Sequence, residues 1–147
     1  MLYQERKAVA RFTVIIKSIV PLQAFVSKKV SLLTAPSKFT VAEASLGDDT
    51  VHMCSLVENV FDKLPESQTL FGKSVDAIRA LLKAFQVQFG EEIKSKDETK
   101  SRAVYTATVQ ASANLKEVQV LGFEFGADVD YNEVFKCLFL DECGGLT

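Results

Sequence analysis

The apolar residues of this chain follow two different periods, and this contrast constrains its fold more than any other feature. In residues 8–19 and 102–125 apolar side chains alternate with small or polar ones, which is typical of strands with one buried face. In residues 53–64 and 75–93 they recur every three or four positions, as in amphipathic helices. Gly and Pro number only 7 and 3, which favours long regular elements over loops. The sequence therefore predicts an α+β fold.

The chain has the length of one domain. Its 147 residues, with 48% hydrophobic and 24% charged residues, suffice to bury a core without a disulfide or a metal. We expect a single domain over residues 1–147.

The first apolar segment has two possible interpretations. Residues 8–19 are rich in β-branched side chains, which favours a strand. A helix with Val9, Phe12, Ile16 and Ile19 on one face fits the same residues, so both assignments remain open.

A proline marks the start of the next predicted element. Pro21 stands where a helix could begin, and apolar spacing predicts that helix over residues 22–33, with its end before Pro36. The alternation in residues 38–45 predicts a short strand after it.

Two amphipathic helices are predicted in the middle of the chain. The first follows the turn at residues 47–50, whose side chains can cap it, and ends at Pro65. The second starts at Ser74, interpreted as its N-cap. The two buried stripes consist of Met53, Leu56, Val57, Val60, Phe61 and Leu64, and of Val75, Ile78, Leu82, Phe85, Phe89 and Ile93.

A β-hairpin is predicted after a charged segment. Residues 94–102 hold no apolar side chain and are interpreted as an exposed linker. The strands 102–112 and 117–125 meet at a tip near Asn114. The apolar parity changes between Val120 and Leu121, which predicts a bulge beside Gly122.

The C-terminal part is predicted to add one short helix. Asp130 and Glu133 have capping-box spacing, and residues 143–147 are interpreted as a loose tail. The expected order is β-α-β-α-α-β-β-α, with the hairpin packed on the two amphipathic helices.

Charge and cysteine content bound the environment of the protein. With 17 basic and 19 acidic residues there is no basic footprint for nucleic acid, and we expect no nucleic-acid partner. The longest apolar stretch is too short for a membrane span. An odd count of 3 Cys argues against a secreted disulfide framework. We expect a soluble protein of the cytoplasm, or of the host cytoplasm if the source is viral or an injected effector.

Catalytic and metal-binding patterns are weak in this sequence. His52 is the single histidine, and it is interpreted as a surface residue rather than a catalytic base. His52, Cys54, Cys137 and Cys143 are zinc-ligand types, but their spacing forms no zinc knuckle, so inert thiols are expected. We expect no metal, no cofactor and no catalytic residue.

Two further motifs match known sites only in part. The segment Asp128–Asn132 resembles the start of a calcium loop, but Glu133 replaces the glycine that such a loop needs. The triplet Gly72–Ser74 matches the end of a P-loop, but Ser67 stands where the first glycine belongs, so helix capping is preferred.

The leading functional hypothesis is a non-enzymatic interaction or assembly module, such as a viral or phage structural component or an adaptor. The chain holds 11 Phe, more apolar area than one small core needs, and surplus apolar area usually forms an interface. We expect self-association or a protein partner, through residues 8–33 or 103–125.

The alternative is a small-ligand binder or enzyme with a pocket between the hairpin and the helices. The predicted interface residues are Phe12, Phe25, Phe39, Phe123 and Phe125.

Overall fold

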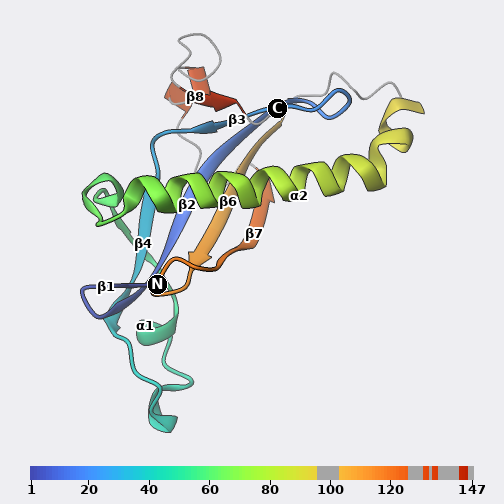
Figure 1. Cartoon of the computed structure of the whole chain (residues 1–147). Helices are drawn as coiled ribbons and strands as arrows, with labels where there is room; N and C mark the ends of the chain where they lie inside the picture. The colour runs from blue at the N-terminus through green and yellow to red at the C-terminus, as the bar shows by residue number, and fades with distance from the viewer. Residues whose placement is uncertain (96–102, 126–130, 133, 136–142, 146–147) are drawn as a thin grey trace.

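One antiparallel sheet and one long helix make up the fold (Figure 1). The computed structural model describes residues 1–95, 103–125, 131–132, 134–135 and 143–145. The strands are β1 (Leu2–Tyr3), β2 (Arg6–Ser18), β3 (Gln23–Ser27), β4 (Ser31–Lys38), β5 (Leu56–Glu58), β6 (Ala103–Ala111), β7 (Val118–Phe125) and β8 (Cys143–Gly145). The helices are α1 (Asp49–His52) and α2 (Ser67–Ser95), with 3-10 turns η1 (Glu43–Ser45) and η2 (Phe61–Lys63).

Strand β2 is the centre of the sheet. Its 13 residues pair with β4 and then β3 along one edge and with β6 along the other. Strand β5 continues the sheet beyond β4, β8 beyond β3, and β7 beyond β6. Among the described residues, β5, β7 and β8 therefore lie at the edges of the sheet, as does the two-residue β1, which pairs with β2 alone.

The strand assignment of the N-terminal segment is confirmed, and the helix predicted after it is wrong. Residues 22–33 instead contribute β3 and the start of β4. The apolar spacing here fits a helix, but one edge of β2 offers hydrogen-bonding groups to β4 and then to β3, and this tertiary pairing decides the outcome. Residues 32–35 of β4 are all buried, which is the pattern of a strand covered on both faces rather than of a helical stripe.

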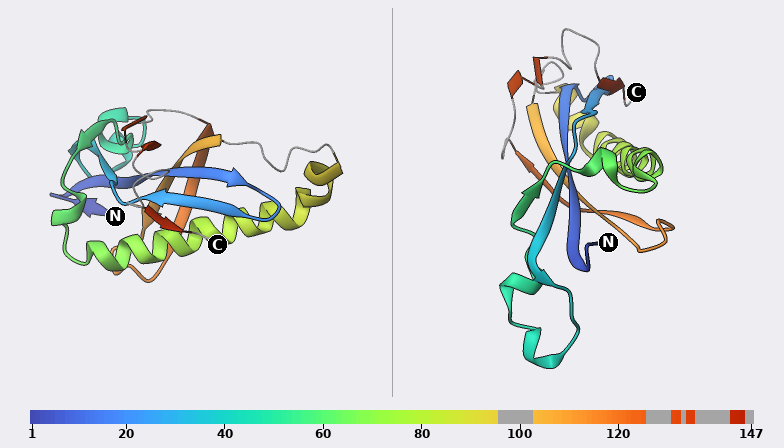
Figure 2. Two further views of the ribbon diagram at one scale, coloured as in Figure 1. Left: turned by 90° about the horizontal axis from the view of Figure 1, so that it is seen from above. Right: turned by 90° about the vertical axis from the view of Figure 1, so that its left-hand side faces the viewer.

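The helix predicted over residues 53–64 is also wrong. Asp48 does cap a helix, because its side chain accepts a hydrogen bond from the backbone N–H of Thr50, but α1 ends at His52. The edge of β4 pairs with Leu56–Glu58, which places Leu56 and Val57 at the surface. The strand predicted over residues 38–45 is replaced by a loop that contains η1 and projects from the end of the sheet (Figure 2).

Helix α2 begins earlier than predicted, at Ser67, so Ser74 lies in its interior rather than at its N-cap. The helix lies on one face of the sheet (Figure 2), and Ser74 is fully buried there. Of its predicted stripe, Ile78 and Leu82 are buried, whereas Phe85 and Phe89 are exposed.

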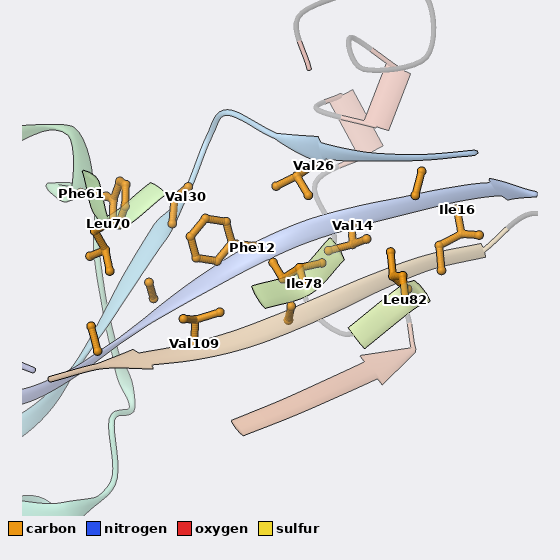
Figure 3. Close-up of a cluster of buried hydrophobic side chains, with 14 of the residues drawn as sticks. Phe12, Val14, Ile16, Val26, Val30, Phe61, Leu70, Ile78, Leu82 and Val109 are labelled. Atoms are coloured by element: carbon orange, nitrogen blue, oxygen red, sulfur yellow. The ribbon is translucent and has the colours of Figure 1, made fainter. Parts of the chain in front are cut away.

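The core lies between α2 and the face of the sheet that α2 covers (Figure 3). Phe12 is fully buried at its centre and contacts Phe61 edge-on, with ring centroids 6.1 Å apart. The labelled side chains in Figure 3 come from β2, β3, β6, α2, η2 and the β3–β4 connection, and are Phe12, Val14, Ile16, Val26, Val30, Phe61, Leu70, Ile78, Leu82 and Val109.

The predicted hairpin is confirmed, including its bulge. Thr108 pairs with Gly122 and Val109 with Val120, so Leu121 is the extra residue of β7. Of the two amphipathic helices that the sequence predicts to pack on the hairpin, only α2 is present, so the expectation of two such helices is corrected.

The structure tests one of the predictions for the C-terminal part of the chain. Residues 143–145 form β8 beside β3, which corrects the loose tail. Most of the predicted linker 94–102 and most of the predicted last helix lie outside the described residues.

Candidate functional site

An apolar cavity of about 360 Å³ lies between α2, the end of β2 and the β6–β7 hairpin. It is the position at which the sequence suggested a pocket, between the hairpin and helical structure. The lining side chains are apolar or aromatic and are those of Ile16, Ile19, Leu81, Leu82, Phe85, Ile93, Ala103, Tyr105 and Phe123.

The length of α2 creates this cavity. The N-terminal half of the helix packs on the sheet through Leu70, Ser74 and Ile78, which are all buried. Its C-terminal half continues past β7, where the described part of the sheet ends (Figure 1). A Cβ added at Gly90 would lie 3.3 Å from the Val20 side chain, so the helix closely approaches the β2–β3 turn there. The cavity is the space that remains between these contacts.

Aromatic side chains form one wall of the cavity. Tyr105 stacks on Phe123, with ring centroids 4.7 Å apart and an interplanar angle of 22°. It also meets Phe125 edge-on, at 5.6 Å and 80°. Across the cavity, Phe85 and Phe89 lie on consecutive turns of α2, with ring centroids 4.9 Å apart.

Several of these side chains are left partly uncovered. Leu81, Phe85 and Phe89 on the helix are 41%, 42% and 37% exposed, and Phe125 on β7 is 74% exposed. Large apolar side chains clustered at the surface usually mark a place where another molecule binds. The cavity and these four residues together form what we call the aromatic groove.

The chemistry of the aromatic groove is that of an apolar binding site. Among the described residues, its lining holds one hydroxyl, that of Tyr105, and no carboxylate, imidazole, thiol or amine. Such a lining can exclude water and contact apolar groups, but it provides no residue pair for acid–base catalysis.

The five predicted interface residues lie in four different parts of the structure. Phe12 is in the core, so its assignment to an interface is corrected. Phe25 is half-buried on the other face of the sheet, with the Lys17 ammonium 5.0 Å from its ring centroid. Phe39 lies on the projecting loop. Only Phe123 and Phe125 come together, at the aromatic groove.

Sequence reasoning missed most of the groove. Phe85 lies on the helical stripe, which predicts burial in the core. Leu81 lies outside that stripe, so its spacing predicts no contact with the sheet. Tyr105 lies in the strand predicted over residues 102–112, where nothing in its spacing distinguishes it from the other strand residues. The signal that could have indicated the groove is the length of α2 compared with the width of the sheet. The helical spacing of apolar residues does not contain this information.

The single histidine lies far along the sheet from the groove, on α1. The His52 ring meets the Phe39 ring edge-on, with centroids 6.1 Å apart, and its Nε2 atom is buried without a hydrogen-bond partner. Packing against Phe39 fits a structural residue better than a catalytic base.

The cysteine that the structure describes with its side chain is only partly buried. The Cys54 thiol donates a hydrogen bond to the Lys7 carbonyl oxygen at 3.4 Å, and desolvation by burial raises the pKa of this thiol. In the described part of the chain, no group of three or more His, Cys, Asp or Glu residues could hold a metal ion. The side chains of Cys137 and Cys143 lie outside the described residues.

The partial P-loop match is part of α2. Gly72, Lys73 and Ser74 are all helical, which contradicts both the phosphate loop and the preferred helix-capping interpretation. Lys73 donates a hydrogen bond to the carbonyl oxygen of Leu115 in the β6–β7 turn, so it ties the helix to the hairpin. The partial calcium loop lies mostly outside the described residues.

Comparison with known proteins shows a similar fold but no family. No protein-family model matches the chain, and no curated protein matches it. Among solved structures, it is similar to the C-terminal domain of K. lactis Pby1, described as an ATP-grasp enzyme that interacts with the mRNA decapping enzyme Dcp2. The TM-score is 0.53 at 16% sequence identity, over 97% of this chain and 48% of that one. The chain thus spans about half the length of this structural neighbour, and the likeness concerns the fold alone.

The helices give no indication of a membrane span. Within the described residues, none combines the length and the apolar character that crossing a bilayer requires.

Proposed function

We propose that this protein is a non-enzymatic protein-binding module and that the aromatic groove is its binding site. The observation that carries the proposal is the apolar cavity of about 360 Å³ bordered by partly exposed aromatic side chains. A partner's apolar side chains would fill the cavity and cover Leu81, Phe85 and Phe125. Aromatic residues of this kind contribute much of the binding energy at protein interfaces.

A small apolar ligand is the second candidate occupant. The volume of the cavity falls within the range of about 300–1,000 Å³ that is usual for small-molecule sites. A ligand of this kind would need few polar groups, because the Tyr105 hydroxyl is the only polar side-chain group that the described residues contribute to the lining.

ATP binding is not part of this proposal. The structural likeness to the Pby1 domain covers 48% of that chain at 16% identity, so it extends to the fold and not to its chemistry.

Photo-crosslinking tests the proposal and separates the two occupants. A photoreactive phenylalanine analogue at position 81 would lie in the groove, because Leu81 lines the cavity. The matched control is the same analogue at position 87, because Val87 is 86% exposed on the same helix but does not line the cavity. Both proteins would be irradiated in cells of the native source and their adducts weighed by mass spectrometry.

The mass of the adduct decides between the outcomes. We expect an adduct of protein size at position 81 and none at position 87. An adduct of a few hundred daltons at position 81 would favour the small ligand instead. No adduct, or equal adducts at the two positions, would contradict the groove as a binding site.

A further inference from the structure

The edge strand beside the aromatic groove, β7, has one edge available for pairing with another chain. In the described part of the chain, β7 pairs with β6 alone, so one row of its backbone N–H and C=O groups has no strand partner. Its sequence, Val-Gln-Val-Leu-Gly-Phe-Glu-Phe, has a single charge, that of Glu124, and no Lys or Pro. Short length, lysine, proline and β-bulges are the usual means by which proteins protect an edge strand from pairing, and of these β7 has only the bulge at Leu121.

The bulge at Leu121 determines which part of β7 lies at the groove. It divides the strand into Val118–Val120 and Gly122–Phe125. The second part contributes Phe123 to the cavity wall and Phe125 to its exposed border. An added strand that pairs with Gly122–Phe125 would therefore run directly along the cavity.

We infer that the occupant of the aromatic groove is an extended segment of a partner protein, which adds to the sheet beside β7. This inference rests on the proposed function and specifies its binding mode. The partner's backbone satisfies the free groups of β7, and every second side chain points toward the cavity beneath α2. The segment therefore carries bulky apolar residues at alternate positions.

The part of α2 that continues past β7 favours a single added strand over a second copy of this chain. Two copies joined antiparallel through β7 would share one continuous sheet with both α2 helices on the same face. Each helix continues past its own β7, so both would occupy the space over the joint (Figure 1). A lone extended segment needs only the space between β7 and one helix.

The probe for this inference is a display library of random decapeptides, selected against the immobilised full chain. Selected peptides should carry bulky apolar residues at positions i, i+2 and i+4. Their affinity should fall at least about tenfold with Phe85→Asp and stay unchanged with the control Val87→Asp, whose site faces solvent. Circular dichroism of both variants checks that each is folded.

N-methylation of a selected peptide then tests strand pairing itself. One synthetic version is methylated at alternate backbone nitrogens and a second at the remaining ones. Strand addition uses the N–H groups of one peptide edge, so one version should lose about tenfold or more in affinity while the other keeps it. Binding through side chains alone would be affected equally by the two versions.

The outcomes separate this inference from the proposed function. Peptides whose apolar residues recur at i, i+3 and i+4, or whose two methylated versions bind alike, would overturn strand addition and leave a protein-binding groove. A library that yields no peptide sensitive to Phe85→Asp would overturn both.

Discussion

Tyr105 of β6 stacks on Phe123 of β7, diagonally across the hairpin, with their ring centroids 4.7 Å apart. The contact depends on the bulge at Leu121. Val118 and Val120 face α2, and if Leu121 were part of a regular strand instead of a bulge, Phe123 and Phe125 would point to the opposite face of the sheet. The bulge reverses the alternation and brings both aromatic rings to the face that α2 covers.

Deleting Leu121 should be tolerated. With that residue removed, Gly122 follows Val120 directly, and Phe123 still faces α2 in a regular strand. We expect a loss of no more than about 1 kcal/mol in the free energy of unfolding, because no buried side chain is lost. Urea denaturation measures this, with deletion of Gln119 as the control, because that deletion turns Val120 away from the helix. An unfolded Leu121 deletion would contradict the assigned register.

Two phenylalanines that both fit a buried pattern should differ in their contribution to stability. Phe12→Ala removes a fully buried ring and should cost about 3–5 kcal/mol. Phe85 is 42% exposed, so Phe85→Ala should cost no more than about 1.5 kcal/mol. Urea melts of the two variants give the comparison, and equal losses would mean that Phe85 is buried in solution.

Replacing Ser74 with alanine should stabilise the protein. The Ser74 hydroxyl is buried without a hydrogen-bond partner, and an unsatisfied buried hydroxyl costs about 1–3 kcal/mol. We expect Ser74→Ala to raise the free energy of unfolding by about 1 kcal/mol, helped by the higher helix propensity of alanine. If Ser74 were the N-cap that its sequence suggested, the same change would lower it by about 1 kcal/mol. The sign of the change in thermal unfolding separates the two.

The capping interaction of α1 should weaken in acid. Hydrogen bonds from the Thr50 hydroxyl, at 2.6 Å, and from its backbone N–H, at 2.9 Å, lower the pKa of the Asp48 carboxyl. Because folding favours the carboxylate, its contribution is present above the ordinary pKa of aspartate and is lost as the pH falls through the lowered pKa. The difference in stability between the native protein and Asp48→Ala should therefore shrink over that acidic range.

An NMR titration measures the same effect directly. The Asp48 side chain should titrate below an ordinary aspartate, and Thr50→Ala should move its pKa part of the way back. A titration at the ordinary value in the native protein would show that the cap is absent in solution.

The parts of the fold that the sequence predicted are those in which local pattern and tertiary pairing agree. Residues 8–19 alternate and are β-branched, and the hairpin has both alternation and a visible change of parity at its bulge. In residues 53–64 the helical spacing is just as regular, yet Leu56–Glu58 form a strand because the edge of β4 is available to pair. The sequence of residues 53–64 carries no signal that an edge of β4 is available for pairing.

The aromatic groove was only half predictable, for a related reason. Phe123 and Phe125 could be proposed as binding residues because they lie outside the helical stripes. Phe85 has the same spacing as Ile78 and Leu82, which are buried, but it lines the cavity and is 42% exposed. Periodicity identifies the face of a helix but not how far the opposing sheet extends.

The most direct test of a protein-binding groove uses the absence of Trp from the sequence. Phe85→Trp places a single indole in the groove, and Val87→Trp places one on the solvent side of the same helix as the control. Each variant is titrated with a selected decapeptide that lacks Trp, and the emission maximum is recorded. Our account predicts a saturable blue shift for Trp at position 85 and none at position 87, because the bound segment excludes water from the groove. An unchanged emission at position 85 during binding, or equal shifts at both positions, would contradict it.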